Sequence, residues 1–279
     1  MSLGGKGQRG KAPPPALTLP LCQKATPCSR TPWSDTLGAS MEISSTAGFH
    51  EIADPGYTVV SDRAGFDRMM EALHAAPRLA VDIEADSLYH YFDKVCLIQI
   101  STDESTFVLD PLAVEQVLPL GAIFASERVE TVFHAASYDT FCLGRDYGFT
   151  FARIFDTHVA AQLLGFVQLG LGALLEALMD VTHSKRRQRD DWSRRPLDPE
   201  QLEYAANDTR HLLGLRDLLE RHLEVKGRLG WAREEFAAAA AAFPQEKIFD
   251  PEGFRRIKGS RDLSLSEFAA LRALYLLRD

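Results

Sequence analysis

The spacing of apolar residues shifts along the chain between the two-residue period of strands and the longer period of helices. Short apolar runs predict strands over 57–60, 79–84, 95–101, 106–109 and 129–133. Helices are predicted over 64–75, after an N-cap at Ser61, over 114–126, from Tyr138 onward, and over 157–165, 171–179 and 198–226. This order predicts an α/β fold in which helices flank a mixed sheet, antiparallel in its first hairpins and parallel later.

The first 40 residues lack that periodicity. They hold six of the 14 prolines and five of the 19 glycines, and offer too little apolar surface to offset the entropy lost on folding. Residues 1–50 are therefore predicted to be a disordered, Pro/Gly-rich segment. Prolines at positions 13–15 and 20 interrupt its apolar stretch, so it is not expected to act as a signal peptide.

The charge and composition of the chain argue against a membrane protein and against nucleic-acid binding through overall positive charge. The net charge is −8, and because residues 1–40 carry +4, the rest of the chain carries −12. A body this acidic binds a polyanion only through a local basic patch or through bound cations. No apolar run reaches the roughly 18 residues that cross a bilayer, so no membrane span is expected. Cys96 and Cys142 lie in apolar segments and are interpreted as buried thiols of a cytoplasmic protein.

Two acids end an otherwise apolar strand. Asp82 and Glu84 alternate with Val81 and Ile83, so the two carboxylates point to the same face of the predicted sheet. Two like charges this close need a cation to remain ionised together, and the end of a strand is where open sheets bind ligands.

Further candidates follow later in the chain. Asp139 stands at the head of a predicted helix, just after the strand that ends at Phe133. Tyr204 and Asp208 are four residues apart on a periodic helix and therefore share one of its faces. Each of these features also occurs by chance, and only their combination indicates a site.

That combination resembles a known family. The strand with Asp-x-Glu, the His-Ala-x-x-x-Asp that ends at Asp139 and the Tyr-x3-Asp of the late helix resemble the Exo I, II and III motifs of the DEDDy 3′-5′ exonucleases. Ribonuclease D is the most similar family, and its fold is ribonuclease H-like. The resemblance extends through FDTHVAAQLLG, GLGALLEALMDV and DWSRRPLDPEQLEYAANDTRHLLGL, and it implies a catalytic domain over 51–235.

The chain departs from this family at one position and from a sibling class at another. Ala135 stands where many ribonuclease D sequences have Asp, although the acid of that motif, Asp139, is present. Glu203 occupies the position at which the DEDDh class has its His. The resemblance is therefore to the tyrosine class.

The resemblance also implies roles for the five motif residues. Two divalent cations, Mg²⁺ or Mn²⁺, would be held by Asp82, Glu84, Asp139 and Asp208. Tyr204, with an ordinary phenol pKa of about 10, would orient the attacking water rather than deprotonate it. Glu84 would help to position the same water.

A basic segment at 185–195 is the expected route for the substrate. It has six basic residues and two acids, and it is either a solvated loop or a guide for the phosphates of the substrate. Trp192 would either stack on a base or anchor the loop in the core. His134 would approach the terminal nucleotide or be a satisfied structural histidine. The substrate-binding candidates are thus His134, Lys185, Arg187, Gln188, Trp192 and Arg195.

The last part of the chain, 236–279, is predicted to be a helical extension. Residues 250–279 resemble the opening of a helicase-and-ribonuclease-D C-terminal (HRDC) domain, either shortened or packed back on the catalytic domain. The whole chain is expected to be a metal-dependent exoribonuclease that trims the 3′ ends of tRNA or other structured RNA. The alternatives are a DNA exonuclease of the Werner type, acting on single-stranded DNA, and an inactive nucleic-acid-binding module.

Overall fold

The computed structural model describes residues 56–184, 186–242 and 249–278. The predicted disordered segment 1–50 and the substrate candidate Lys185 lie outside these residues. Among the described residues, no helix combines the length and the apolar character that crossing a bilayer requires.

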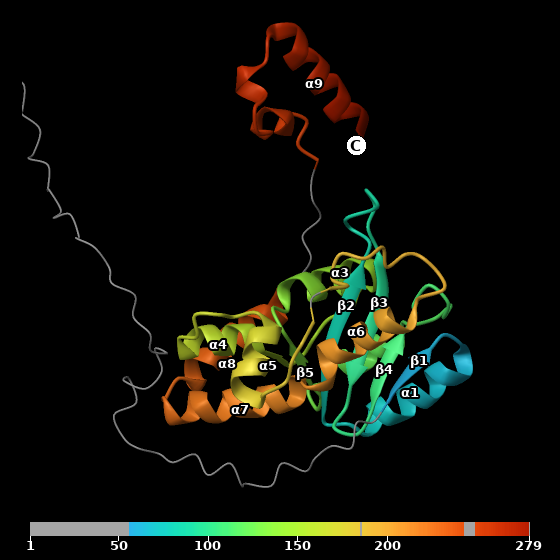
Figure 1. The fold of residues 1–279 in the computed structure, drawn as a ribbon, viewed down its shortest axis with the longest axis vertical. Helices are drawn as coiled ribbons and strands as arrows, with labels where there is room; N and C mark the ends of the chain where they lie inside the picture. Colours follow the sequence, from blue (N-terminus) through green and yellow to red (C-terminus); the bar gives the residue numbers. More distant parts are fainter. Residues whose placement is uncertain (1–55, 185, 243–248, 279) are drawn as a thin grey trace, which may run out of the picture. The chain divides into compact units, whose positions relative to one another are not determined.

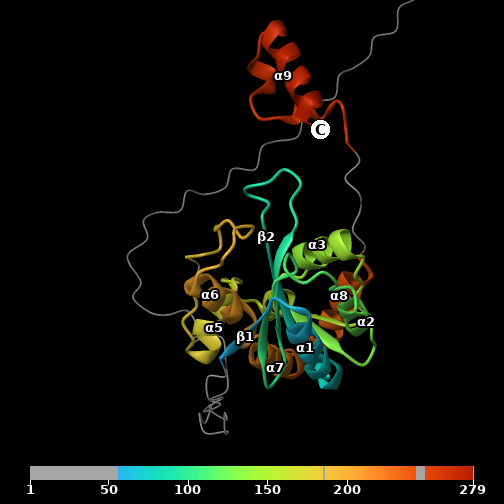
Figure 2. The same cartoon turned by 90° about the vertical axis from the view of Figure 1, so that its right-hand side faces the viewer.

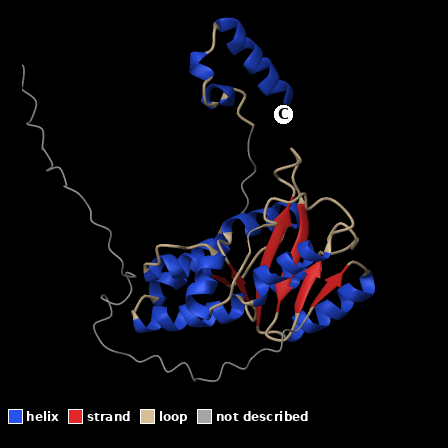
Figure 3. Ribbon diagram, viewed as in Figure 1, coloured by secondary structure: helices blue, strands red, loops and turns tan. Residues whose placement is uncertain are grey.

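A six-stranded mixed sheet forms the centre of the fold (Figures 1 and 3). Its strand order is β1-β4-β3-β2-β5-β6. Strands β2, β3 and β4 pair antiparallel, whereas β1 pairs parallel with β4, and β5 and β6 extend the sheet parallel to β2. The strands are β1 (Tyr57–Val60), β2 (Arg78–Ala85), β3 (Val95–Ser101), β4 (Thr106–Leu109), β5 (Glu130–Phe133) and β6 (Ile154–Asp156). This arrangement confirms the predicted mixed sheet.

Helices cover both faces of the sheet. Figure 2 shows α1 (Arg63–Ala75), α2 (Leu120–Phe124) and α3 (Ser137–Tyr147) on one side, and α5 (Leu171–Met179) and α6 (Pro199–Arg210) on the other. Gathered beside β5 are α4 (Thr157–Leu164), α5, α7 (Leu212–Val225) and α8 (Leu229–Ala241) (Figure 1). Alternate residues of β2 enter different cores, with Val81 and Ile83 on the α1 side and Ala80 on the α7 side.

Several predicted boundaries are wrong for physical reasons. The N-cap of α1 is Asp62, not Ser61, because the Asp62 carboxylate accepts the Gly65 N–H at 2.7 Å. The helix predicted over 114–126 shrinks to α2, because Pro119 disfavours a helical conformation for the residue before it. The three-residue strand β6 is too short to show a period and was not predicted. The helix predicted over 198–226 is interrupted at His211, so that α6 packs on β3 and β4 while α7 packs on α4 and β5.

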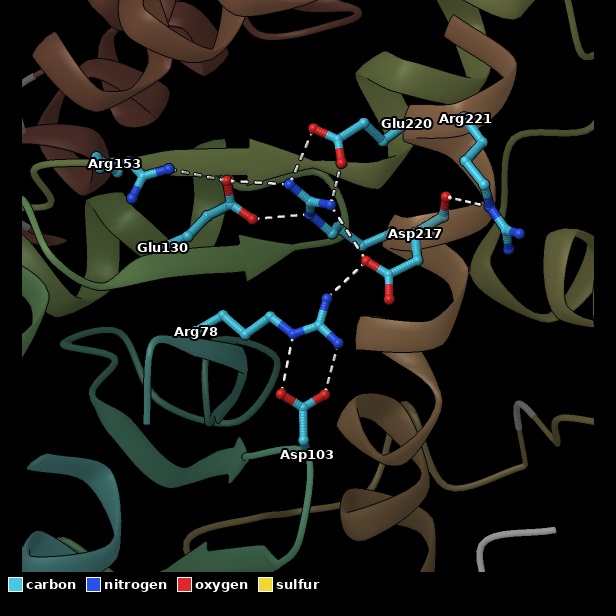
Figure 4. Close-up of polar contacts among 8 residues, drawn as sticks. Arg78, Asp103, Glu130, Arg153, Asp217, Glu220 and Arg221 are labelled. Atoms are coloured by element: carbon cyan, nitrogen blue, oxygen red, sulfur yellow. Dashed lines mark hydrogen bonds and ion pairs between the residues drawn. The ribbon is translucent and has the colours of Figure 1, made fainter. Parts of the chain in front are cut away.

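An ion network fastens α7 to the sheet at the start of β2 (Figure 4). The guanidinium of Arg216 donates to Glu130 of β5 at 2.7 Å and also pairs with Glu220. Arg78 of β2 donates to Asp217 at 2.6 Å and makes a bidentate pair with Asp103. This network therefore joins β2, β5 and α7 at the end of β2 opposite to the acids.

The C-terminal part contains the short turns η1 (Gly253–Arg256) and η2 (Ser260–Asp262) and the helix α9 (Leu265–Arg278). Phe254 is its buried centre, with its ring 5.0 Å from that of Phe268. The boundary expected at residue 236 falls inside α8, where Phe236 packs 4.6 Å from Phe155. The resemblance of this part to an HRDC domain stays a prediction.

Candidate active site

Asp82 and Glu84 lie on the face of β2 that is covered by α6. Their neighbours Val81 and Ile83 enter the opposite core, as the two-residue period predicts. The pairing of β2 with β3 shifts register between Glu84 and Ala85. The regular hydrogen-bonding pattern between the two strands is therefore interrupted directly after Glu84.

Asp208 reaches these two acids from α6. Asp198 and Gln201 begin this helix with a capping box. Thr209 anchors the helix to the sheet through a hydrogen bond of 2.8 Å with Ser101 of β3. The preceding residue, Asp208, is thereby brought over β2. Ligand atoms of Asp82, Glu84 and Asp208 lie within 4.8 Å of one another.

Asp139, in the first turn of α3, is not one of the three acids within 4.8 Å of one another, but its charge acts on Asp82. The turn before α3 is shaped by the Asp156 carboxylate, which accepts the N–H groups of Ala135 at 3.0 Å and Ala136 at 2.9 Å. Ala135 has a φ of 66°, the left-handed region that costs a non-glycine residue about 1 kcal/mol and that Asp tolerates better. Asp, common here in the family that the sequence resembles, would thus suit this backbone better than Ala.

Burial and mutual repulsion dominate the electrostatics of the cluster. Burial, followed by the charges of the neighbouring carboxylates, raises the pKa of Asp82 and of Glu84 well above the usual range. The pKa of Asp139 is raised in the same way, by burial and by Asp156 and Asp208. Among the described residues, no ion pair includes Asp82, Glu84 or Asp139. The protein itself therefore supplies little positive charge to offset these acids.

The donor set fits a hard divalent cation. Carboxylate oxygens are the ligands that Mg²⁺ and Mn²⁺ prefer, and three acids converge within reach of one ion. Gln99 stands directly opposite Asp82 in the β2–β3 register, and both polar atoms of its buried side chain lack a hydrogen-bond partner. The unpaired amide of Gln99 beside the negatively charged carboxylates indicates that this site binds a ligand, such as a hydrated cation.

Tyr204 lies one helical turn before Asp208 and faces the same cluster. Burial, and next the charges of Asp208 and Glu84, raise the pKa of the Tyr204 phenol above its ordinary value of 10.0. The phenol is therefore neutral near pH 7 and can act as a hydrogen-bond donor. Its ring lies 6.0 Å from the ring of Trp192.

His183 is a site residue that the sequence reasoning missed. It lies in the connection between α5 and α6, and its Nε2 is 2.8 Å from Asp208 Oδ1. The imidazole partly offsets the rise that burial causes in the pKa of Asp208. No spacing rule links a histidine on a loop to an acid 25 residues later, so only the tertiary structure reveals this contact.

Two of the substrate-binding candidates, Trp192 and Arg195, lie in structural positions, and for Trp192 this is the loop-anchoring alternative. The side chain of Trp192 is 1% exposed and packs with Ala205 and Ala206 of α6, so it anchors the loop. All five guanidinium hydrogens of Arg195 have acceptors, two of which are the carboxylate oxygens of Asp110, at 2.6 and 2.8 Å. The burial of the Trp192 ring and the five acceptors around Arg195 favour structural roles for both residues.

Of the other described substrate candidates, His134 and Arg187 have partners within the protein, whereas Gln188 is exposed to solvent. His134 makes a hydrogen bond of 2.9 Å with Thr157, and burial lowers its pKa to about 4, so it corresponds to the satisfied structural histidine. Arg187 is paired with Asp190 at 3.1 Å and with Glu200, and it therefore braces the loop against α6. Gln188 is exposed, as are Arg186, Arg189 and Arg194 of the same segment.

A groove lies between α6 and the loop that precedes it, next to Tyr204. It has a volume of about 710 Å³ and is bounded on one side by the loop that carries His183 and on the other by α6. Its lining includes Tyr204, His183, Arg186, Arg187, Glu203 and Asn207. The groove therefore connects a basic loop with the phenol that faces the acid cluster.

A loop with exposed aromatic residues borders the site at the end of β2. The buried carboxylate of Asp86 holds this loop by accepting the backbone N–H and the side-chain ammonium of Lys94, each at 2.8 Å. The Tyr89 hydroxyl donates to Arg189 O at 2.7 Å, which joins the loop to the basic segment. Phe92 is 82% exposed. Three aromatic residues within 89–92, between two strands, are the sequence signal that could have revealed this loop.

Known proteins are similar to this chain over most of its length. A family model described as 3′-5′ exonuclease matches residues 57–224. The exosome complex component 10 homolog of Caenorhabditis elegans is 30% identical over 245 residues, covering 86% of this chain and 28% of that protein. Ribonuclease D of Granulibacter bethesdensis is 34% identical over 185 residues, covering 66% of this chain and 47% of that protein. The chain thus spans about half, or less, of the length of these curated relatives.

Solved structures show the same similarity. The catalytic core of RRP6 from Trypanosoma brucei superposes with a TM-score of 0.73 at 27% identity, covering 79% of this chain and 62% of that chain. Brucella melitensis NrnC with bound Mg²⁺ superposes with a TM-score of 0.56 at 26% identity, covering 66% of this chain and 89% of that chain. The chain therefore belongs to the 3′-5′ exonuclease family, as a homologue of ribonuclease D and RRP6.

Proposed function

We propose that this protein is a metal-dependent exoribonuclease that removes nucleotides one at a time from RNA 3′ ends and releases 5′-mononucleotides. The observation that carries the proposal is the convergence of three carboxylates within 4.8 Å, with Tyr204 one helical turn before one of them. Acids this close are unfavourable unless a cation binds them, and a cation held by oxygen ligands is what phosphodiester hydrolysis requires.

Two divalent cations, Mg²⁺ or Mn²⁺, are part of this proposal. Asp82, Glu84, Asp208 and Asp139 would hold them, the first three of these acids lying within 4.8 Å of one another. When bound, the metals supply charge neutralisation for the scissile phosphate and lower the pKa of the attacking water.

The side chains of Tyr204 and Glu84 would orient the attacking water. The neutral Tyr204 phenol would donate a hydrogen bond to the attacking water or to the phosphate that it approaches. Glu84 lies at the end of β2 and would accept a hydrogen bond from the same water. Because Tyr204 and Asp208 stand one turn apart on α6, the helix would hold the phenol in a fixed position relative to the carboxylate that it accompanies.

The single-stranded 3′ end of an RNA is the part of the substrate that this site would bind. The exposed arginines of the basic segment would attract its phosphates, and the aromatic loop would stack with its bases, since stacking binds single strands whatever their sequence. The names of the relatives, a ribonuclease D and an exosome component, support RNA over DNA. We further propose that the protein trims the 3′ ends of tRNA or other structured RNA in the cytoplasm. The free, buried thiols of Cys96 and Cys142 support a reducing compartment.

A comparison of matched substrates tests the proposal. Purified protein would be given RNA and DNA of one sequence, each with a 3′ overhang, in Mg²⁺, Mn²⁺ or excess chelator, with Asp82→Asn as the control variant. We expect metal-dependent release of 5′-mononucleotides from RNA that is absent in the variant. Hydrolysis in chelator would refute the metal mechanism, whereas faster hydrolysis of DNA than of RNA would refute the assignment as a ribonuclease.

A further inference from the structure

The side chain of His183 is enclosed on two sides next to the acid cluster. It is 5% exposed. On one side lies Gly172 of α5, where an added Cβ would stand 3.3 Å from the backbone oxygen of His183 and 3.5 Å from its Cβ. On the other side the ring faces Tyr204 at 6.0 Å between centroids. The absence of a side chain at Gly172 therefore lets the loop bring the imidazole close to α6.

Asp208 is the polar group that this imidazole approaches. Nε2 lies 2.8 Å from Oδ1, a close contact that is not aligned as a directed hydrogen bond, and Nδ1 has no hydrogen-bond partner among the described residues. His134, in contrast, is satisfied by Thr157. Buried polar side chains usually form hydrogen bonds that hold the fold together, and this imidazole forms none among the described residues. Its contact with Asp208 is therefore the feature that calls for an explanation.

We propose that His183 is a positioning residue, which holds one carboxylate oxygen of Asp208 so that the other oxygen faces Asp82 and Glu84. A carboxylate that rotates freely has to be ordered before it can bind an ion, and a partner on one oxygen removes that cost in advance. Groups that orient metal ligands in this way typically change metal affinity by about 10- to 100-fold. The inference rests on the metal site of the proposed function and is independent of the choice between RNA and DNA.

Titration of the full chain with Mn²⁺ alone, followed by calorimetry, tests this role. His183→Leu removes both nitrogens at similar volume, whereas His183→Gln keeps a side-chain donor. We expect His183→Leu to weaken Mn²⁺ binding by about 10- to 100-fold and His183→Gln to restore most of the affinity. His158→Leu is the matched control, since His158 has no contact with Asp208, and it should bind Mn²⁺ as the parent does.

A second measurement separates positioning from direct ligation. Pulsed electron paramagnetic resonance of the Mn²⁺-loaded parent detects a coordinated imidazole through its nitrogen coupling. We expect no such coupling, because His183 contacts the ligand and not the ion. A nitrogen coupling that is lost in His183→Leu would overturn the proposal by making His183 a ligand.

The outcomes also separate this proposal from the proposed function. Equal Mn²⁺ affinity in the parent and in a folded His183→Leu variant would refute the role of His183 alone. No Mn²⁺ binding by the parent would refute the metal site and this inference together. If His183→Leu does not fold, Gly172→Ala, which crowds the His183 backbone but keeps the imidazole, is expected to lower the affinity, and an unchanged affinity there would overturn the proposal.

Discussion

Replacing Asp82 by Asn should abolish hydrolysis and yet stabilise the metal-free protein. Asp82 is held among Glu84, Asp139 and Asp208, and the repulsion among them opposes folding whenever they are ionised. Two unit charges 4.8 Å apart, the limit for three of these acids, repel by about 3.5 kcal/mol at an effective dielectric constant of 20. Uptake of a proton relieves part of this repulsion. We therefore expect the variant to gain about 1 to 3 kcal/mol near pH 8, which raises Tm by about 3 to 10 °C.

The pH dependence of this gain follows from the direction of the pKa shifts. Because the pKa values of Asp82, Glu84 and Asp139 are raised in the folded protein, their contribution to stability is complete below the unfolded values near 4 and is lost as the pH rises through the folded values. The metal-free parent should therefore lose stability from about pH 4 upward. The advantage of the Asn variant should grow over the same interval.

Thermal unfolding in chelator, from pH 5 to pH 8, measures this effect. Addition of Mg²⁺ should raise the Tm of the parent more than that of Asp82→Asn, since a ligand stabilises the state that binds it. A variant whose Tm at pH 8 is equal to or below that of the metal-free parent would refute the reasoning, because it would show that the cluster is not held under charge repulsion.

Four further outcomes are expected. Tyr204→Phe should slow single-turnover hydrolysis by about 100-fold while calorimetry shows unchanged Mn²⁺ affinity, and an unchanged rate would remove the phenol from the mechanism. Reversal of Arg186 and Arg189 to Glu should reduce the salt slope of RNA binding by about 1.4, and an equal slope would leave the segment a solvated loop. Phe92→Ala should weaken the binding of single-stranded RNA by about 1 to 3 kcal/mol with Tm unchanged, and equal affinity would argue against stacking. Glu130→Gln should lower the stability to urea by up to about 3 kcal/mol, because it breaks the ion network of Figure 4, and a neutral effect would show that the partner arginine finds other acceptors.

The sequence by itself determined which side chains share one face of a strand or of a helix. The two-residue period of a strand is enough to place Asp82 and Glu84 on one face, and the turn of a helix is enough to place Tyr204 beside Asp208. Both rules act over a few residues, so they hold before any tertiary contact forms. The order of strands and helices likewise predicted the mixed sheet, because each element carries its own hydrophobic period.

The tertiary structure decided which residues far apart in the chain meet and what their side chains can still do. The basic segment looked uniform in sequence, yet Trp192 is buried under α6, Arg195 uses all its donors on acceptors such as Asp110, and the neighbouring Arg186 stays exposed. His183 meets Asp208 through a loop that packs closely against Gly172 of α5. Burial and long-range contacts set these roles, and since both depend on how the elements pack, no spacing along the chain could predict them.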